Sequence, residues 1–173
     1  MSYFIIIIDD GEYRKKCGGR RRYYVYKYVL IFWRIDMAIK IIGTGSYLPE
    51  NVADNHFLST IVDTNDEWIS QRTGIKERRL SSGSKEGTTY MATQAAKNAM
   101  EDAGVTAEEI DLIIVATASA DTYVPNTSCQ VQGEIGAIRE TCFDLNAACS
   151  GFLFALNTAD AYLETGMAKT VLV

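Results

Sequence analysis

The stretch TCFDLNAACSGFLFALNTADAYLETGMAKTVLV, residues 141–173, decides the fold class of this chain. It begins with an apolar run at 142–145, continues with helix-forming residues over 150–165 and ends with a second apolar run at 170–173. Gly166 stands where the helix should stop, because glycine readily adopts the left-handed conformation that ends many helices. A strand, a helix and a second strand in this order are typical of the parallel sheet of an α/β protein.

The same alternation of strands and helices extends upstream to Met37. A short apolar run predicts a strand over 39–43 that ends in a turn at Gly43-Thr44-Gly45. Thr64 and Glu67 form the pattern of a capping box, which predicts a short helix beginning near Asn65. Further expected elements are an alanine-rich helix over 91–103, a capped helical turn at 106–109, a buried strand over 112–116 and a helix over 126–135. The predicted fold class is therefore α/β, a mostly parallel sheet with helices on its faces.

A change of composition divides the chain before Met37. Residues 1–36 carry eight Lys or Arg against four Asp or Glu, a net charge of +4, whereas the remainder carries −9. Half of the aromatic residues also lie in this first segment, without a helical or strand period. We interpret 1–36 as an unrelated amino-terminal extension, disordered or non-native, with a membrane-surface patch as the alternative. Because 37–173 ends inside an expected strand, we expect this part to be truncated.

The composition also excludes several classes of function. The formal charge of −5 argues against a nucleic-acid partner, because phosphate binding needs a basic surface. No apolar run reaches the roughly 20 residues that a membrane-spanning helix needs. The cysteines at 17, 129, 142 and 149 match neither a zinc pattern nor a disulfide framework, which predicts reduced thiols in the cytoplasm. A single histidine, His56, leaves little for metal or catalytic-triad chemistry.

Cys149 is the strongest candidate for a reactive group. It lies between the carboxyl end of an expected strand and the amino end of an expected helix, where open α/β sheets bind their ligands. Backbone N–H groups and the helix dipole at this place favour a thiolate and stabilise an oxyanion. The alternative is that Cys149 is a buried small hydrophobic residue, and we interpret Cys129 and Cys142 in that way.

A second constellation is formed by Trp68 and Arg72, which stand four residues apart and therefore on one face of the expected helix. An indole beside a guanidinium can stack on a planar base while the cation pairs with a phosphate, which suits a nucleotide-bearing substrate. The alternative is a surface cation–π contact without a ligand. His56 is interpreted as a solvated loop residue and not as a general base.

Three stretches together resemble the amino-terminal half of β-ketoacyl-acyl carrier protein synthase III, a thiolase-fold enzyme that starts type II fatty acid synthesis. They are IIGTGSYLP at 41–49, DTNDEWISQRTGIKERR at 63–79 and NAACSGF at 146–152. The resemblance covers 37–173 and not 1–36. It implies a truncated thiolase-like fold.

The resemblance also implies roles for individual residues. Cys149 looks like the nucleophile that takes an acetyl or other short acyl group from acyl-CoA, with the coenzyme A thioester as substrate and no cofactor. Trp68, Arg72 and, less directly, Thr64 look like part of the coenzyme A site. The loop Tyr123-Val124-Pro125 looks like a segment of the family's homodimer interface. The acyl-Cys149 would then condense with malonyl-acyl carrier protein.

The chain departs from the family because the histidine and asparagine that promote decarboxylation belong to the second half, which makes this truncated chain inactive in condensation. Two alternatives to the fatty acid enzyme stay open. One is a secondary-metabolite ketosynthase of the same superfamily. The other is a noncatalytic module that binds coenzyme A or carrier protein and in which Cys149 is never acylated.

Overall fold

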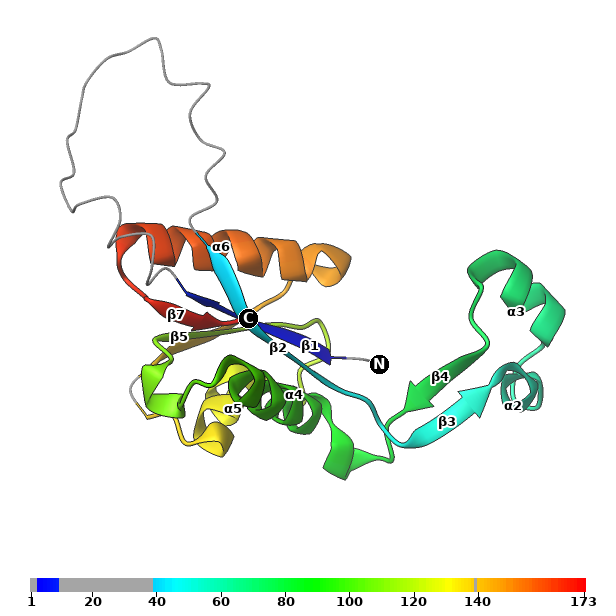
Figure 1. Cartoon of the computed structure of the whole chain (residues 1–173). Coiled ribbons are helices and arrows are strands. Elements are labelled where there is room, and N and C mark those ends of the chain that lie inside the picture. Colours follow the sequence, from blue (N-terminus) through cyan, green and yellow to red (C-terminus); the bar gives the residue numbers. More distant parts are fainter. Residues whose placement is uncertain (1–2, 10–38, 139) are drawn as a thin grey trace, which may run out of the picture.

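The computed structural model describes residues 3–9, 39–138 and 140–173, and its centre is a five-stranded sheet (Figure 1). The strand order is β2-β1-β7-β5-β6. β5 is parallel to β6 and to β7, while β1 is antiparallel to both of its neighbours, so that β2 runs in the same direction as β7. The expected mostly parallel sheet is confirmed. The strands are β1 (Tyr3–Asp9), β2 (Lys40–Tyr47), β5 (Leu112–Ala116), β6 (Thr141–Leu145) and β7 (Thr170–Leu172).

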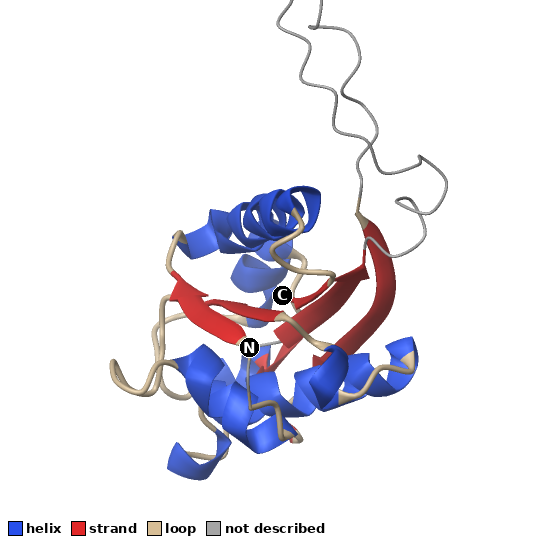
Figure 2. Ribbon diagram, turned by 90° about the vertical axis from the view of Figure 1, so that its left-hand side faces the viewer, coloured by secondary structure: helices blue, strands red, loops and turns tan. Residues whose placement is uncertain are grey.

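Helices cover both faces of the sheet (Figures 1 and 2). α6 (Gly151–Thr165) packs on one face, where its buried residues Ala155, Ala159 and Leu163 meet Leu112 and Ile114 of β5. α4 (Thr88–Ala103) and α5 (Thr127–Ile135) cover the other face. The alternate residues of β5 thus enter two separate cores, which is why this strand is apolar at every position. A 3-10 turn, η2 (Ala107–Glu109), precedes β5 as the Thr106 and Glu109 pattern predicts.

The strand β1 lies within 1–36, and it differs from the expected disorder for Tyr3–Asp9 alone. Tyr3–Asp9 lies between β2 and β7, and Ile7 is completely buried. The physical reason lies in the run Ile5–Ile8, because consecutive β-branched residues favour a strand that is buried on both faces. Residues 10–36 lie outside the described residues, and the division of the chain at Met37 stays a prediction.

β2 continues through Gly43-Thr44-Gly45, so the turn expected there is wrong. The two glycines instead allow α4 to approach the strand closely. A Cβ on Gly45 would collide with the backbone oxygen of Ala95, and one on Gly43 would lie 2.5 Å from the Cβ of Ala103. Ala95 and Ala99 are fully buried at this contact. Small residues on both sides therefore set the distance between helix and sheet.

An arm extends from the sheet on the right of Figure 1. It consists of the antiparallel pair β3 (Asn51–Asp54) and β4 (Glu77–Leu80) with the short helices α2 (Asn55–Ser59) and α3 (Asp66–Thr73) at its end. Buried Asn55 holds the arm together, since it donates to Asp66 Oδ1 at 2.7 Å and accepts from Arg78 at 2.8 Å. A 3-10 turn, η1 (Ser84–Glu86), leads from the arm into α4.

The ends of α3 confirm one sequence prediction and correct another. Gly74 has a φ of +71° and ends the helix in the left-handed conformation, as predicted. The amino-terminal cap, however, is Asn65 and not Thr64, because the Asn65 side chain accepts from Trp68 N at 2.8 Å. The capping box of Thr64 and Glu67 is therefore wrong. Glu67 instead accepts from Gln71, one turn further along the helix.

Candidate active site

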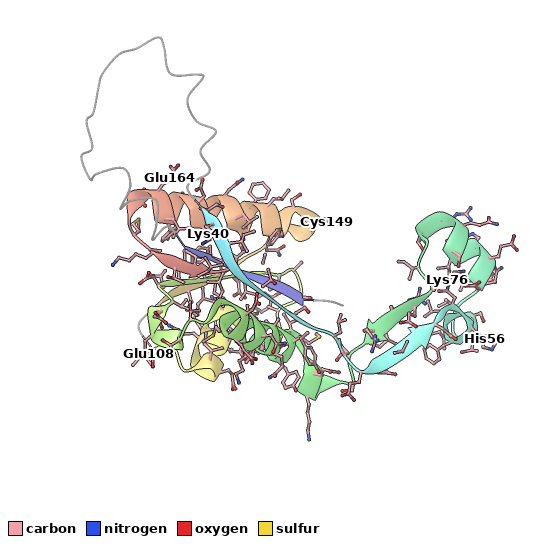
Figure 3. The ribbon with its side chains drawn as sticks, in the orientation of Figure 1. Lys40, His56, Lys76, Glu108, Cys149 and Glu164 are labelled. Carbon is pink, nitrogen blue, oxygen red and sulfur yellow. The ribbon has the colours of Figure 1, made fainter. Side chains whose placement is uncertain are left out.

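Cys149 is exposed at the turn that joins β6 to α6 (Figure 3). The preceding strand is fixed in the sheet, because Leu145 pairs with Ala116 of β5 and its carbonyl accepts from Thr117 N at 3.0 Å. The following helix begins at Gly151, and a 3-10 turn, η3 (Ala148–Ser150), carries the cysteine between them. The predicted strand–cysteine–helix junction is confirmed, and the alternative of a buried Cys149 is wrong.

The backbone of this turn is unusual. Ala148 has a φ of +45° and is the one non-glycine residue of the described part with a positive φ, a conformation that costs energy for an L-residue. The turn is supported by hydrogen bonds from Ser150 N to Ala147 O at 3.0 Å and from Ala148 N to Asn146 Oδ1 at 3.4 Å. Such strain next to an exposed thiol is a feature of functional sites.

The start of α6 is close to β5 and lacks a side-chain cap. A Cβ on Gly151 would lie 3.2 Å from the Cβ of Ala116, which is a tight contact that Ala116 would have to relieve by a few tenths of an ångström. Ser150, the residue before the helix, makes no capping hydrogen bond through its side chain. The Gly151 N–H donates to Ala148 O of the preceding 3-10 turn, and the N–H groups in the first turn of a helix have no acceptor within that helix.

Asp144 fixes the end of β6 to α5 and was not identified from the sequence. Its carboxylate accepts from Thr127 N at 2.9 Å and from Ser128 N at 2.7 Å, the first N–H groups of α5. Asn126 adds a cap by accepting from Cys129 N at 3.0 Å. A polar residue within the apolar strand 142–145 is the only sign of this role in the sequence. Asp144 thus anchors the strand that carries the Cys149 turn.

Trp68 and Arg72 lie together on α3, as their spacing predicts. The guanidinium carbon of Arg72 is 4.4 Å from the centroid of the Trp68 ring, and Trp68 is 51% exposed. Thr64 stands just before this helix, and its Oγ1 is buried without a hydrogen-bond partner in the described part of the chain. Among the described residues, no hydrogen bond or ring contact joins these side chains to the Cys149 turn. The structure thus brings Trp68 and Arg72 together and leaves Cys149 apart from them.

The remaining candidates fall into two groups. His56 lies on α2 of the arm, so it contributes no base at Cys149 (Figure 3). Cys142 is half-buried beside the core, but Cys129 is exposed, so the expectation of a buried Cys129 is wrong. The reason is that Cys129 lies beside the start of β6, with its Sγ 3.1 Å from Cys142 Sγ, and does not enter the core, whereas Val131 does.

Neither of two hollows in the described ranges has Cys149 in its lining. A hollow of 610 Å³ between α4 and α5 is lined in part by Thr93, Asp121 and Gln130, and one of 360 Å³ lies on the arm beside Phe57. Within residues 3–9, 39–138 and 140–173, no group of three or more His, Cys, Asp or Glu could hold a metal ion. No helix of these ranges has the length and apolarity needed to cross a membrane.

Comparisons with known proteins agree with this geometry. The family model of 3-oxoacyl-[acyl-carrier-protein] synthase III matches residues 143–173. β-Ketoacyl-[acyl-carrier-protein] synthase III of Clostridium acetobutylicum is 57% identical over 136 residues, and that of Clostridium botulinum strain Langeland is 54% identical over 135. These matches cover 79% and 78% of this chain and 41% of each relative, so the chain spans about two fifths of the curated relatives' length.

Solved structures give the same result. 3-Oxoacyl-[acyl-carrier-protein] synthase III from Aquifex aeolicus matches with a TM-score of 0.73 and 54% identity, covering 76% of this chain and 42% of that one. The priming β-ketosynthase of the R1128 polyketide pathway matches with a TM-score of 0.72 and 38% identity, covering 75% and 38%. The layered sheet with its cysteine turn thus defines the amino-terminal part of a thiolase-like fold. The chain is homologous to the amino-terminal part of β-ketoacyl-[acyl-carrier-protein] synthase III.

Proposed function

We propose that this chain forms the acyl-accepting part of an acyltransferase that starts type II fatty acid synthesis. The observation that carries the proposal is the exposed Cys149 in the strained turn between β6 and α6. The 57% identity to a β-ketoacyl-acyl carrier protein synthase III supports the choice of reaction. The substrates of the complete reaction are a short acyl-CoA, such as acetyl-CoA, and malonyl-acyl carrier protein.

The first step is acyl transfer to sulfur. The Cys149 thiolate attacks the carbonyl carbon of the acyl-CoA thioester, and the negative charge moves to the carbonyl oxygen. Backbone N–H groups in the first turn of α6, other than that of Gly151, which donates to Ala148 O, stabilise this oxyanion. When the tetrahedral intermediate collapses, the bond from carbon to the sulfur of coenzyme A breaks, and the thiolate of coenzyme A leaves. The product is an acyl thioester on Cys149.

The nucleotide end of the acyl-CoA binds on the arm. Trp68 offers its exposed indole for the adenine, and Arg72, whose guanidinium carbon lies over one face of the same ring at 4.4 Å from its centroid, supplies a cation for phosphate. The unpartnered Thr64 Oγ1 supplies a further polar contact. The alternative of a cation–π contact without a ligand predicts that coenzyme A binding is independent of Trp68.

The second step is decarboxylative condensation. Loss of carbon dioxide from the malonyl thioester leaves an enolate, which attacks the acyl carbonyl on Cys149; a carbon–carbon bond forms and the bond to sulfur breaks. The developing enolate needs hydrogen-bond donors. His56 is remote from Cys149 on α2, and we assign these donors to the part of the relatives beyond the matched 41%. The chain by itself then performs acyl transfer at most.

The proposed assembly is a cytoplasmic homodimer. Tyr123 and Val124 precede α5 and are 98% and 89% exposed, which is costly for apolar side chains unless a partner covers them. We propose that the Tyr123-Val124-Pro125 loop contacts the second copy. The cytoplasm suits a chain whose described cysteines are all free thiols.

A ketosynthase of secondary metabolism is the second candidate function, supported by the similarity to the priming enzyme of the R1128 polyketide pathway. Both candidates acylate Cys149 and differ in the acyl group. The noncatalytic binding module predicts coenzyme A binding with Cys149 unmodified.

The test combines acetyl-CoA and malonyl-acyl carrier protein with this chain and with a longer protein that continues it through the length of its relatives. We expect the longer protein to release a β-ketoacyl product, and this chain to give none. The Cys149→Ser variant of the longer protein should lose acylation, because an alcohol is far less ionised than a thiol. Turnover of malonyl-acyl carrier protein by this chain alone would contradict the assignment of the decarboxylation donors.

A further inference from the structure

We propose that Cys129 and Cys142 are a redox pair that closes reversibly to a disulfide between α5 and β6. The pair is separate from the proposed acyl transfer, which uses only Cys149. A disulfide at this place joins the helix that Asp144 caps to the strand that leads into the Cys149 turn.

The positions of the two sulfurs carry the proposal. Cys129 Sγ and Cys142 Sγ are 3.1 Å apart, and a disulfide bond is about 2.05 Å long, so about 1 Å of movement closes the bond. Cys129 lies in the first turn of α5 and Cys142 near the start of β6. α5 packs along β6, so the fold itself holds the two thiols side by side.

Polar neighbours orient the buried member of the pair. Cys142 Sγ donates to Gln132 Oε1 at 3.3 Å, and Gln132 Nε2 in turn donates to Glu140 O at 3.0 Å. Gln132 thus bridges α5 to the residues that lead into β6 and keeps Cys142 directed at the helix. In the described part of the chain, Cys149 has no second cysteine sulfur within hydrogen-bond distance.

The two thiols differ in exposure, and this difference determines which of them reacts first with an oxidant. Cys129 is exposed and meets a dissolved oxidant first. Cys142 is half-buried, and burial together with the hydrogen bond to Cys129 raises its pKa to about 11. Cys142 is therefore a neutral thiol at pH 7, and Cys129 is the sulfur that begins the exchange.

With glutathione disulfide as oxidant the reaction balances. The Cys129 thiolate attacks one sulfur of glutathione disulfide, forms a mixed disulfide and releases one glutathione. Cys142 then loses its proton, attacks Cys129 Sγ and releases the second glutathione. Two protein thiols are oxidised and one glutathione disulfide is reduced. The raised pKa of Cys142 slows the second attack, while the short distance between the sulfurs accelerates it.

The test treats the reduced chain with glutathione disulfide and maps peptides without reduction. We expect a mass loss of about 2 Da and one linked peptide pair containing Cys129 and Cys142, with Cys149 still open to alkylation. The matched variants separate the two steps: Cys142→Ser should retain glutathione on Cys129, and Cys129→Ser should leave Cys142 reduced. Stable glutathione on Cys129 of the unmutated chain, or a disulfide that includes Cys17 or Cys149, would overturn the proposal.

Discussion

Replacing Asp144 by alanine tests how the Cys149 turn is positioned. The variant removes the acceptor of two backbone hydrogen bonds, from Thr127 N at 2.9 Å and Ser128 N at 2.7 Å, at the start of α5. Loss of a helix cap costs about 1–2 kcal/mol. For a chain of this size each kcal/mol lowers the Tm by roughly 2–4 °C, so we expect a decrease of about 2–8 °C in thermal unfolding followed by circular dichroism.

Asp121→Ala is the matched control. Asp121 caps α4 in the same way, since it accepts from Thr88 N at 2.9 Å and Thr89 N at 2.7 Å, but it is not part of the strand that leads to Cys149. Both variants should lose similar stability. Only Asp144→Ala should change the rate at which iodoacetamide alkylates Cys149, by about threefold or more if the end of β6 shifts by a fraction of an ångström. Equal alkylation rates in the two variants would refute the positioning role of Asp144.

Further predictions concern packing, pH and binding. Gly45→Ala should lower stability by about 1–3 kcal/mol because its Cβ would meet backbone atoms of α4, whereas Gly133→Ala, in open space on α5, should raise it by about 0.5–1 kcal/mol in urea unfolding. Ile7→Asp should lower the Tm by several degrees, and an unchanged Tm would show that β1 does not contribute to stability. Hydrogen bonds from the Tyr47 hydroxyl and Ser82 lower the pKa of Glu86 below its ordinary 4.5. The ionised Glu86 therefore stabilises the fold fully above pH 4.5, and this contribution is lost as the pH falls through the lower pKa of the folded state. In the Glu86→Gln variant the Tm should fall less steeply as the pH is lowered in this range. In a longer protein, Trp68→Ala should weaken acyl-CoA binding by about 1–3 kcal/mol in calorimetry, and equal binding would favour the cation–π contact alone.

The sequence predicts the layered part of the fold well, for an identifiable reason. β5 is apolar at every position and α4 repeats alanine at helical spacing, so the local pattern of each element predicts which of its residues are buried. The helix ends predicted at Gly74 and Gly166 are also confirmed, because the left-handed conformation that ends a helix depends mainly on the glycine itself.

The errors arise where the partner of a residue is distant in the sequence. Gly43 and Gly45 look like a turn, and only the approach of α4, about fifty residues later, explains them. Ile5–Ile8 stands in a segment of foreign composition, but β7 at the other end of the chain pairs with it. Non-local pairing of this kind leaves little trace in local patterns.

The candidate site shows the same division. The sequence identifies Cys149 from its local strand-to-helix context, and it places Trp68 beside Arg72 from their spacing. It does not find the role of Asp144, whose hydrogen-bond donors lie on the preceding helix α5. Nor does it find the contact between Cys129 of α5 and Cys142 of β6. The roles of Cys149, Trp68, Arg72 and Thr64 in substrate chemistry stay predictions.

The most direct test of the central claim is peptide mass spectrometry of this chain after incubation with acetyl-CoA. We expect slow transfer of an acetyl group to Cys149, below one group per chain, with Cys129 and Cys142 unmodified and with no label in Cys149→Ala. An acetyl group on another cysteine, an undiminished label in Cys149→Ala, or the complete absence of acylation at a Cys149 that still reacts with iodoacetamide would contradict it.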